Sequence, residues 1–320
     1  MIKKLLVILK TTLPLLIGLF LVYYSYHNTS PQDRISILNS ILMADYKYIF
    51  LGIFMGILSH LSRAVRWKYL LNPIGYKISF SNSIMSIMAS YLGNLGIPRS
   101  GEILRATSLY AYENVPFEKG FGTIVTERII DVIILFACIV LGIYLSPELW
   151  NTKSWKFNFN YDPTQILIGF LIILFIIFLI FFIIKKFSIK NKIYDFVSGL
   201  KKGLMSITIM KKKKKFVLHT FFIWMMYFFM TYIIKFSLPE TATLEFEPLF
   251  IAFVAGAIAL STTNGGIGVY PLAIAAVLSQ YNVSYEVALA FGWIIWTSQS
   301  IMILFFGSLS FIFLPILNKK

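Results

Sequence analysis

Residues 94–105 read Asn-Leu-Gly-Ile-Pro-Arg-Ser-Gly-Glu-Ile-Leu-Arg, and this stretch decides how the chain is expected to fold. It places two arginines and a glutamate within a strongly apolar sequence. Ionisable groups at membrane depth are costly and mark a functional site by default. The glycines and the proline interrupt a regular helix, and broken backbone at that depth survives only where protein or a water-filled cavity covers it. The stretch therefore predicts a turn between two short helices, with its charged groups facing a polar cavity.

The composition of the whole chain is that of a membrane protein. Of its 320 residues, 58% are hydrophobic and only 13% are charged, with a mean hydropathy of +0.77. Soluble domains average about 25% charged residues. The net charge of +15 could suggest a nucleic-acid partner, but the lysines cluster beside apolar spans without an aromatic-basic platform. We therefore expect an all-α polytopic membrane protein that binds no nucleic acid.

Residues that bind metals or perform catalysis are sparse. A single cysteine, Cys138, allows no internal disulfide. The histidines at positions 27, 60 and 219 lie far apart and form no ligand spacing. The sequence contains no Ser/His/Asp set, no phosphate-binding loop and no pair of catalytic carboxylates. We expect no metal, no cofactor and no enzyme activity.

The apolar segments predict six spanning helices and two helical hairpins. A helix needs roughly 20 apolar residues to cross the hydrocarbon core. By this rule the spans lie at 5–26, 46–71, 119–145, 164–184, 216–238 and 285–314. Two further apolar stretches, 79–112 and 247–281, are broken by Gly, Pro, Asn and Ser. We interpret both as re-entrant hairpins; the alternative is an ordinary kinked span at each place.

The order of these segments predicts two inverted halves within one membrane domain, 1–320. The halves, 1–146 and 147–320, each contain three spans and one hairpin. Three crossings are an odd number, so the second half must be inserted upside down relative to the first. Paired broken segments in inverted halves are the usual indication of a transporter binding site. The symmetry rests on hydropathy, because the halves share no residue-level repeat.

The distribution of lysines predicts the orientation. With re-entrant hairpins, one side receives both termini and the loop 185–215, which holds eleven lysines between Lys185 and Lys215. The positive-inside rule makes this side cytoplasmic, in the cell inner (plasma) membrane. The loop also predicts an amphipathic helix on the inner leaflet. Its apolar face comprises Ile193, Phe196, Val197, Leu200, Leu204 and Ile207. The run Lys211–Lys215 is interpreted as a topology signal that also contacts anionic lipid.

Three groups of charged residues lie within the apolar segments. They are His60, Arg63 and Arg66 on the second span, Arg99, Glu102 and Arg105 in the first hairpin, and Glu127, Arg128 and Asp131 on the third span. Residues three or four apart share a helix face, so Glu127 can act with Asp131, and Glu102 could pair with Arg105. Arg66 could instead be an anchor in the head-group layer.

These groups carry an excess of positive charge. Five arginines oppose three carboxylates, a difference of 5 − 3 = +2. Arginine suits bidentate phosphate binding, and a helix that begins after Pro98 would aim backbone N–H groups at the same place. The simplest ligand is a lipid phosphate. The alternative is a self-satisfied ion-pair network that only holds the hairpin against the span.

We therefore predict two sets of site residues. The set that binds an anionic lipid head group is Arg63, Arg66, Asn94, Arg99, Glu102, Arg105, Glu127, Arg128 and Asp131. The set that lines the path with exposed backbone is Pro98, Gly101, Asn264, Gly265, Gly266 and Gly268.

The favoured function is to translocate or bind an anionic phospholipid or a polyprenyl-phosphate-linked lipid. One alternative is an intramembrane lipid-modifying transferase with Glu102, Glu127 or Asp131 as base. The other is an accessory subunit of a lipid synthase. The expected partners are membrane lipids, with a second copy of the chain or a lipid-biosynthesis protein as further partners.

Four motifs resemble the lysylphosphatidylglycerol synthase transmembrane, or flippase-like, family. They are Arg63-Ala-Val-Arg66-Trp67, then Asn94 with Pro98-Arg99-Ser-Gly101-Glu102-Ile-Leu-Arg105, then Gly122-Thr-Ile-Val-Thr-Glu127-Arg128-Ile-Ile-Asp131, and Gly265-Gly266-Ile-Gly268. The resemblance implies a membrane domain with re-entrant hairpins that moves lipids between leaflets. Tyr270-Pro271 stand where some members carry an acidic residue. The full synthases also have a soluble aminoacyl-transfer domain, for which we expect no room here.

Overall fold

The computed structural model describes residues 30–97, 99–147, 190–263 and 265–319, together with residues 20, 22–24, 26 and 27. Helices and turns make up this part of the chain, and it contains no strand, which confirms the all-α prediction for it. The predicted span 164–184 and most of 5–26 lie outside the described residues, as do Pro98 and Asn264. The six-span arrangement therefore stays a prediction.

Four helices are long and apolar enough to cross a membrane within the described ranges. They are α3 (Tyr46–Leu71), α6 (Phe117–Leu145), α10 (Lys213–Ile234) and α14 (Tyr285–Leu317). Short 3-10 turns, η1 (Asn72–Ile74) and η4 (Lys235–Ser237), extend α3 and α10. The α3 helix begins where the side chain of Asp45 accepts a hydrogen bond from Lys47 N, at 3.0 Å, which satisfies a free N–H group of its first turn.

Each broken apolar stretch folds as two short helices that double back. The first contains α4 (Phe80–Gly96) and α5 (Ser100–Glu113), and the second contains α12 (Phe246–Thr262), α13 (Val269–Leu278) and η5 (Ser279–Tyr281). The open end of the first pair is closed where Glu113 accepts a hydrogen bond from Ser79 N, at 2.9 Å. At the second pair, Tyr281 donates to Glu247 at 2.8 Å. The chain thus returns to the end from which each pair began.

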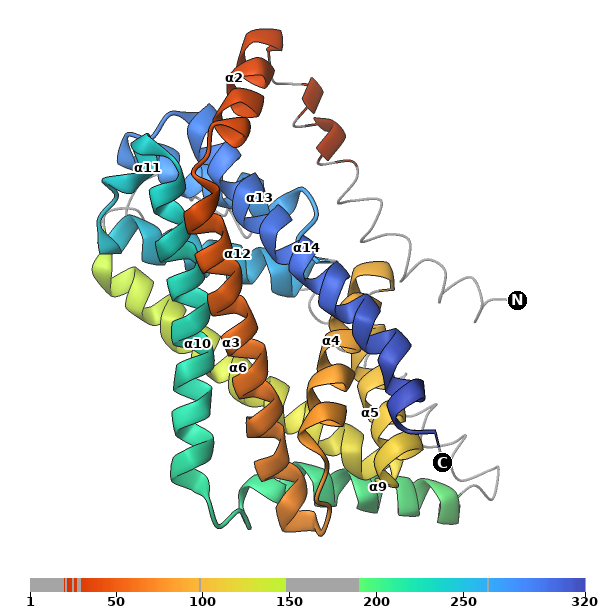
Figure 1. The fold of residues 1–320 in the computed structure, drawn as a ribbon. Coiled ribbons are helices and arrows are strands. Elements are labelled where there is room, and N and C mark those ends of the chain that lie inside the picture. Colours follow the sequence, from red (N-terminus) through yellow and green to blue (C-terminus); the bar gives the residue numbers. More distant parts are fainter. Residues whose placement is uncertain are drawn as a thin grey trace, which may run out of the picture.

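The helices α3 and α10 run side by side through the molecule (Figure 1). Small residues allow their close approach. A Cβ added to Gly52 would lie 2.6 Å from the side chain of Ile234, and one added to Gly56 would lie 3.5 Å from the sulfur of Met230, both on α10. Small residues at helix crossings are typical of membrane proteins, in which packing takes over the role that hydrophobic burial has in water.

The last helix of each half packs against both helix pairs. The α14 helix contacts α13 of its own half, where a Cβ on Gly292 would meet the Pro271 backbone at 2.7 Å. It also contacts α4 of the other half, where a Cβ on Gly307 would meet the Leu92 side chain at 2.8 Å. In the same way, α6 contacts α5 of its own half and α12 of the other. The two halves are therefore interlocked.

The helix predicted in the basic loop is present as α9 (Lys190–Leu204), followed by η3 (Met205–Ile207). Phe196 and Val197, on its predicted apolar face, are 43% and 51% exposed, and the packing of this face on the inner leaflet stays a prediction. The helix also turns small residues toward α6: a Cβ on Gly203 would lie 2.5 Å from the Lys119 carbonyl oxygen. A Cβ on Gly122 of α6 would likewise lie 2.5 Å from the Leu200 carbonyl oxygen, so the two helices approach backbone to backbone. Residues 185–189 lie outside the described part.

The two ends of the molecule differ in their elements. Figure 1 places α9 and the C-terminal end of the chain at one end, and α2 (Pro31–Leu42) and α11 (Pro239–Ala242) at the other. The lysine run 211–215 precedes and begins α10, on the same end as α9.

Candidate functional site

Five charged side chains from three helices converge on one point. Arg63 and Arg66 come from α3, Arg105 from α5, and Glu127 and Asp131 from α6; we call them the arginine–carboxylate network. Glu127 lies 2.5 Å from Arg63, 3.2 Å from Arg66 and 2.8 Å from Arg105. Asp131, one turn further along α6, lies 2.7 Å from Arg63 and 3.0 Å from Arg66. The structure thus brings together residues up to 68 positions apart in the sequence.

The network is sealed from solvent. The side chains of the three arginines are exposed by 3% or less, Glu127 by 0% and Asp131 by 12%. This burial excludes the alternative in which Arg66 is an anchor in the head-group layer. The predicted pair of Glu102 with Arg105 is also wrong. Arg105 instead forms a bidentate ion pair with Glu127, because the face of α5 that carries Arg105 turns toward α6.

Neighbouring polar and aromatic groups hold the arginines in place. The guanidinium of Arg105 lies 3.7 Å from the ring centre of Trp67, a cation–π contact that is strongest when desolvated. The α10 helix contributes two hydroxyl groups: Arg63 donates to Tyr227 at 3.2 Å, and Arg66 donates to Thr220 at 3.2 Å. The sequence reasoning missed both, because they lie in a plain apolar span. Trp67 itself is fully buried.

The network carries an uncompensated positive charge. Three arginines oppose two carboxylates, so the sum is 3 − 2 = +1. The Nε atoms of all three arginines are buried and have no hydrogen-bond partner among the described residues. Removing an ion from water is costly unless it is paired. Among the described residues, the network thus buries one more positive than negative charge.

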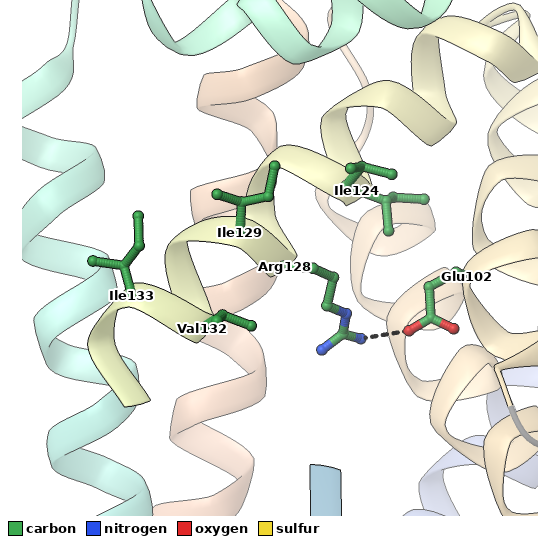
Figure 2. Close-up of a pocket in the computed structure, with 7 residues that line it drawn as sticks. Glu102, Ile124, Arg128, Ile129, Val132 and Ile133 are labelled. Carbon is green, nitrogen blue, oxygen red and sulfur yellow. Dashed lines mark ion pairs between the residues drawn. The ribbon is translucent and has the colours of Figure 1, made fainter. Parts of the chain in front are cut away.

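A fourth arginine lies beside the network in a more open position. Arg128 of α6 contacts Glu102 of α5 at 3.1 Å, and their side chains are 37% and 22% exposed. Figure 2 shows the two side chains reaching toward each other across the space between α6 and α5. They line a cavity of about 320 Å³, whose other walls are apolar residues of α6.

The turn of the first pair places a fifth arginine on the surface. Arg99 precedes α5 with φ of 59°, is exposed, and forms no ion pair with the described residues. Asn94 accepts a hydrogen bond from Gly101 N at 2.8 Å. A Cβ on Gly101 would lie 2.1 Å from the Ser90 carbonyl oxygen, so only glycine fits there. The turn thus fixes its own shape and leaves the Arg99 side chain on the surface.

The turn of the second pair contains three glycines with positive φ: Gly265, Gly266 and Gly268, at 64°, 74° and 70°. Trp296 of α14 donates a hydrogen bond to the Gly265 carbonyl oxygen at 2.7 Å. A Cβ on Gly265 would lie 2.9 Å from the side chain of Leu95, so the turns of the two pairs touch. Pro98 and Asn264 lie outside the described residues.

The model of the lysylphosphatidylglycerol synthase TM region family matches residues 11–307. The chain belongs to this family. It is accordingly a multi-pass membrane protein, and the matched range contains every predicted site residue.

Relatives of the chain include proteins from several archaea. A UPF0104 membrane protein of Methanocaldococcus jannaschii is 26% identical over 133 residues, which cover 39% of this chain and 40% of that protein. A UPF0104 membrane protein of Pyrococcus horikoshii is 26% identical over 276 residues, 78% of this chain and 82% of that protein. The glycosyltransferase AglD of Haloferax volcanii is 29% identical over 104 residues, 32% of this chain and 16% of that protein. No solved structure matches the chain.

In this member of the lysylphosphatidylglycerol synthase TM region family, the open end of each helix pair is closed by a glutamate. Glu113 accepts hydrogen bonds from Ser79 and from Asn82, at 2.8 and 2.7 Å. Asn82 also exchanges two amide hydrogen bonds, at 2.9 and 2.8 Å, with Asn318 just beyond α14. We call this group the Glu113 clip.

The second pair is closed by an analogous group, the Glu247 clip. Glu247 accepts hydrogen bonds from Tyr281 and from Ser146, which follows α6. Ser146 and Tyr281 also contact each other at 2.6 Å. Each clip therefore joins a helix pair to the last helix of the opposite half.

His60 is a buried polar residue close to the network. It is 3% exposed, and neither ring nitrogen has a hydrogen-bond partner among the described residues. Its ring centre lies 4.8 Å from that of Tyr91 and 6.2 Å from that of Tyr227. The predicted shared face of His60 and Arg63 holds, since Arg63 lies one turn further along α3 and also contacts Tyr227.

Proposed function

We propose that this protein binds the anionic head group of a membrane lipid and translocates it between leaflets. The observation that carries the proposal is the buried charge of +1 in the arginine–carboxylate network. Two more accessible arginines lie on the same elements: the half-exposed Arg128 follows Glu127 in α6, and the exposed Arg99 immediately precedes α5. Intramembrane ionisable groups typically mark substrate pathways, and arginine suits phosphate recognition. The lipid is an anionic phospholipid or a polyprenyl-phosphate-linked lipid.

The contact pattern supports two inverted halves with re-entrant pairs. In this symmetry α3 corresponds to α10, the first helix pair to the second, and α6 to α14. The contacts of α6 with α5 and α12 then correspond to those of α14 with α13 and α4. The symmetry also exchanges the Glu113 clip with the Glu247 clip. The two turns would then meet inside the membrane, at the interface between the halves. Transporter sites typically lie at such an interface.

The charge distribution supports cytoplasmic termini. The end of the molecule with α9 and the C-terminus carries the run Lys211–Lys215, whereas α2, α11 and the residues that follow α11 contribute acidic residues to the other end. By the positive-inside rule, the lysine-rich end faces the cytoplasm.

A lipid scrambling assay tests the function. The purified chain is reconstituted into phosphatidylcholine vesicles that hold a trace of fluorescent phosphatidylglycerol, and a membrane-impermeant reductant reports how much probe reaches the outer leaflet. We expect scrambling above empty vesicles, and a several-fold slower rate for Arg99→Gln. The matched control is Lys201→Gln, which removes an exposed positive charge on α9. Rates equal to empty vesicles for phosphatidylglycerol and for a polyprenyl phosphate probe would contradict the proposal.

A second candidate function follows from the relationship to the glycosyltransferase AglD. The chain would then be an accessory membrane partner of an enzyme that modifies lipid-linked sugars. This function predicts that Arg99→Gln leaves the cell's lipid products unchanged, whereas disruption of a partner interface abolishes them. Mass spectrometry of lipids from a deletion strain separates the two functions. A missing product indicates the accessory role, and a normal product on the wrong leaflet indicates translocation.

A further inference from the structure

One face of α6 forms an apolar groove that ends at a charged pair. The cavity of about 320 Å³ is lined by Ile124, Val125, Arg128, Ile129, Val132 and Ile133, together with Glu102 of α5. The α6 residues form two adjacent rows, 124, 128 and 132 and 125, 129 and 133, each at intervals of four, so they share one helix face. Ile124 is fully buried, whereas Ile129, Val132 and Ile133 are 51%, 63% and 59% exposed. The groove therefore opens sideways along α6 (Figure 2).

The ion pair between Arg128 and Glu102 at the end of the groove is monodentate. Arg128 and Glu102 share one contact of 3.1 Å, although a guanidinium and a carboxylate can form two parallel hydrogen bonds. Arg128 Nε and Glu102 Oε2 are buried and lack hydrogen-bond partners among the described residues. Each member of the pair therefore keeps a buried polar atom without a partner, which indicates a pair that a better-fitting anion can separate.

The depth of Arg128 distinguishes this place from ordinary lipid contact. It lies 128 − 117 = 11 residues into α6, which corresponds to about 16 Å along the helix axis. A phosphate bound there would lie well inside a hydrocarbon core of about 30 Å rather than in the head-group layer. Next to it in the sequence is Glu127, the centre of the positively charged network.

We propose that this groove is a lateral docking site for a glycerophospholipid. One acyl chain lies on the Ile124–Ile133 face, and the phosphodiester replaces Glu102 as the partner of Arg128. The inference rests on the proposed function and adds the place of entry and the lipid class. A phosphodiester carries a single charge, which matches the one guanidinium, that of Arg128, among the residues that line the groove. A phosphate monoester carries about −1.5 to −2 at neutral pH, and Glu102 beside the site would repel it.

Photo-crosslinking tests the docking site. The purified full-length chain, in phosphatidylcholine nanodiscs, is mixed with a phosphatidylglycerol that has a diazirine in one acyl chain. Mass spectrometry maps the labelled residues. We expect labelling to concentrate in residues 124–133, to fall roughly tenfold with Arg128→Gln, which removes a charge-assisted hydrogen bond, and to rise with Glu102→Gln.

A variant pair on α6 tests the groove without touching a charge. Val132→Trp fills the cavity and should lower the labelling. Val140→Trp changes the same residue type two turns further along, where the side chain is 50% exposed but does not line the cavity, and should leave the labelling unchanged. Equal labelling by an uncharged diacylglycerol probe, or no effect of Arg128→Gln, would show that the groove only contacts bulk lipid and would contradict the docking site. Displacement by polyprenyl phosphate but not by phosphatidylglycerol would overturn the lipid class.

The scrambling assay separates this inference from the function on which it rests. Scrambling without labelling of residues 124–133 would refute the docking site and leave the proposed function standing. Labelling that depends on Arg128 without scrambling would establish the docking site and refute translocation.

Discussion

Removing the charge of Glu127 should destabilise the protein far more than removing that of Arg105, one of its three arginine partners. Glu127 is fully buried between three guanidiniums, at 2.5, 3.2 and 2.8 Å. In Glu127→Gln the network's charge rises from 3 − 2 = +1 to 3 − 1 = +2. Breaking a buried pair in this way costs about 3–5 kcal/mol, a large share of a total stability of about 5–15 kcal/mol.

Arg105→Gln breaks the same ion pair with the opposite electrostatic result. The network's charge falls from +1 to 2 − 2 = 0, so the excess is relieved. The main loss is then the cation–π contact with Trp67, 3.7 Å away, which is worth about 0.5–2 kcal/mol. The double variant returns the charge to 2 − 1 = +1 and should be more stable than Glu127→Gln alone.

Unfolding by sodium dodecyl sulfate in mixed micelles measures these differences, with size-exclusion profiles as a check on folding. The two single variants and the double variant form a cycle that isolates the coupling between the two side chains. If Arg105→Gln is as destabilising as Glu127→Gln, the network carries no excess positive charge. The electrostatic basis of the proposed head-group site would then be wrong.

Three further predictions follow from the geometry. The exchange Glu127→Arg with Arg105→Glu should recover part of the folded yield lost in Glu127→Arg alone, since the two side chains pair directly; equal yields would contradict this. Gly101→Ala should destabilise by about 1–3 kcal/mol, because its Cβ would lie 2.1 Å from a carbonyl oxygen, whereas Gly96→Ala, with nothing within 4 Å, should be nearly neutral; the same micelle assay compares them. In a Cys138→Ser background, a cysteine at position 240 should react with an impermeant reagent added outside intact cells, and one at position 318 should not; the reverse result would invert the topology.

Much of the fold was predictable because membranes impose simple rules on length and pairing. Four of the six predicted spans coincide with long apolar helices, and the breaks near Gly101 and Gly265 do mark turns between short helices. These features depend on local sequence: apolar length, and glycine where no Cβ fits or φ is positive. The clustering of charges was predictable too, since isolated charges in lipid would be too costly.

The pairing within the network was not predictable from spacing. Glu102 and Arg105 are three apart, yet Glu102 contacts Arg128 and Arg105 contacts Glu127. Long side chains select partners across helices, and that choice depends on how α5 is rotated against α6. The role of Tyr227 and the docking of α9 on α6 were hidden for the same reason. Both are set by contacts between segments that are remote in sequence.

The Glu113 clip has a consequence for how the protein is made. Asn82 and its partner Asn318 are 236 residues apart. Ribosomes add about 5–20 residues per second, so the first helix pair waits on the order of 10–50 seconds for the helix that closes it. Throughout that interval, the buried amide of Asn82 lacks its final partner while the surrounding helices are already in the bilayer. The first pair therefore closes in two stages: Glu113 can bind Asn82 early, and the last helix replaces whatever meets the remaining amide groups, such as water at this exposed end.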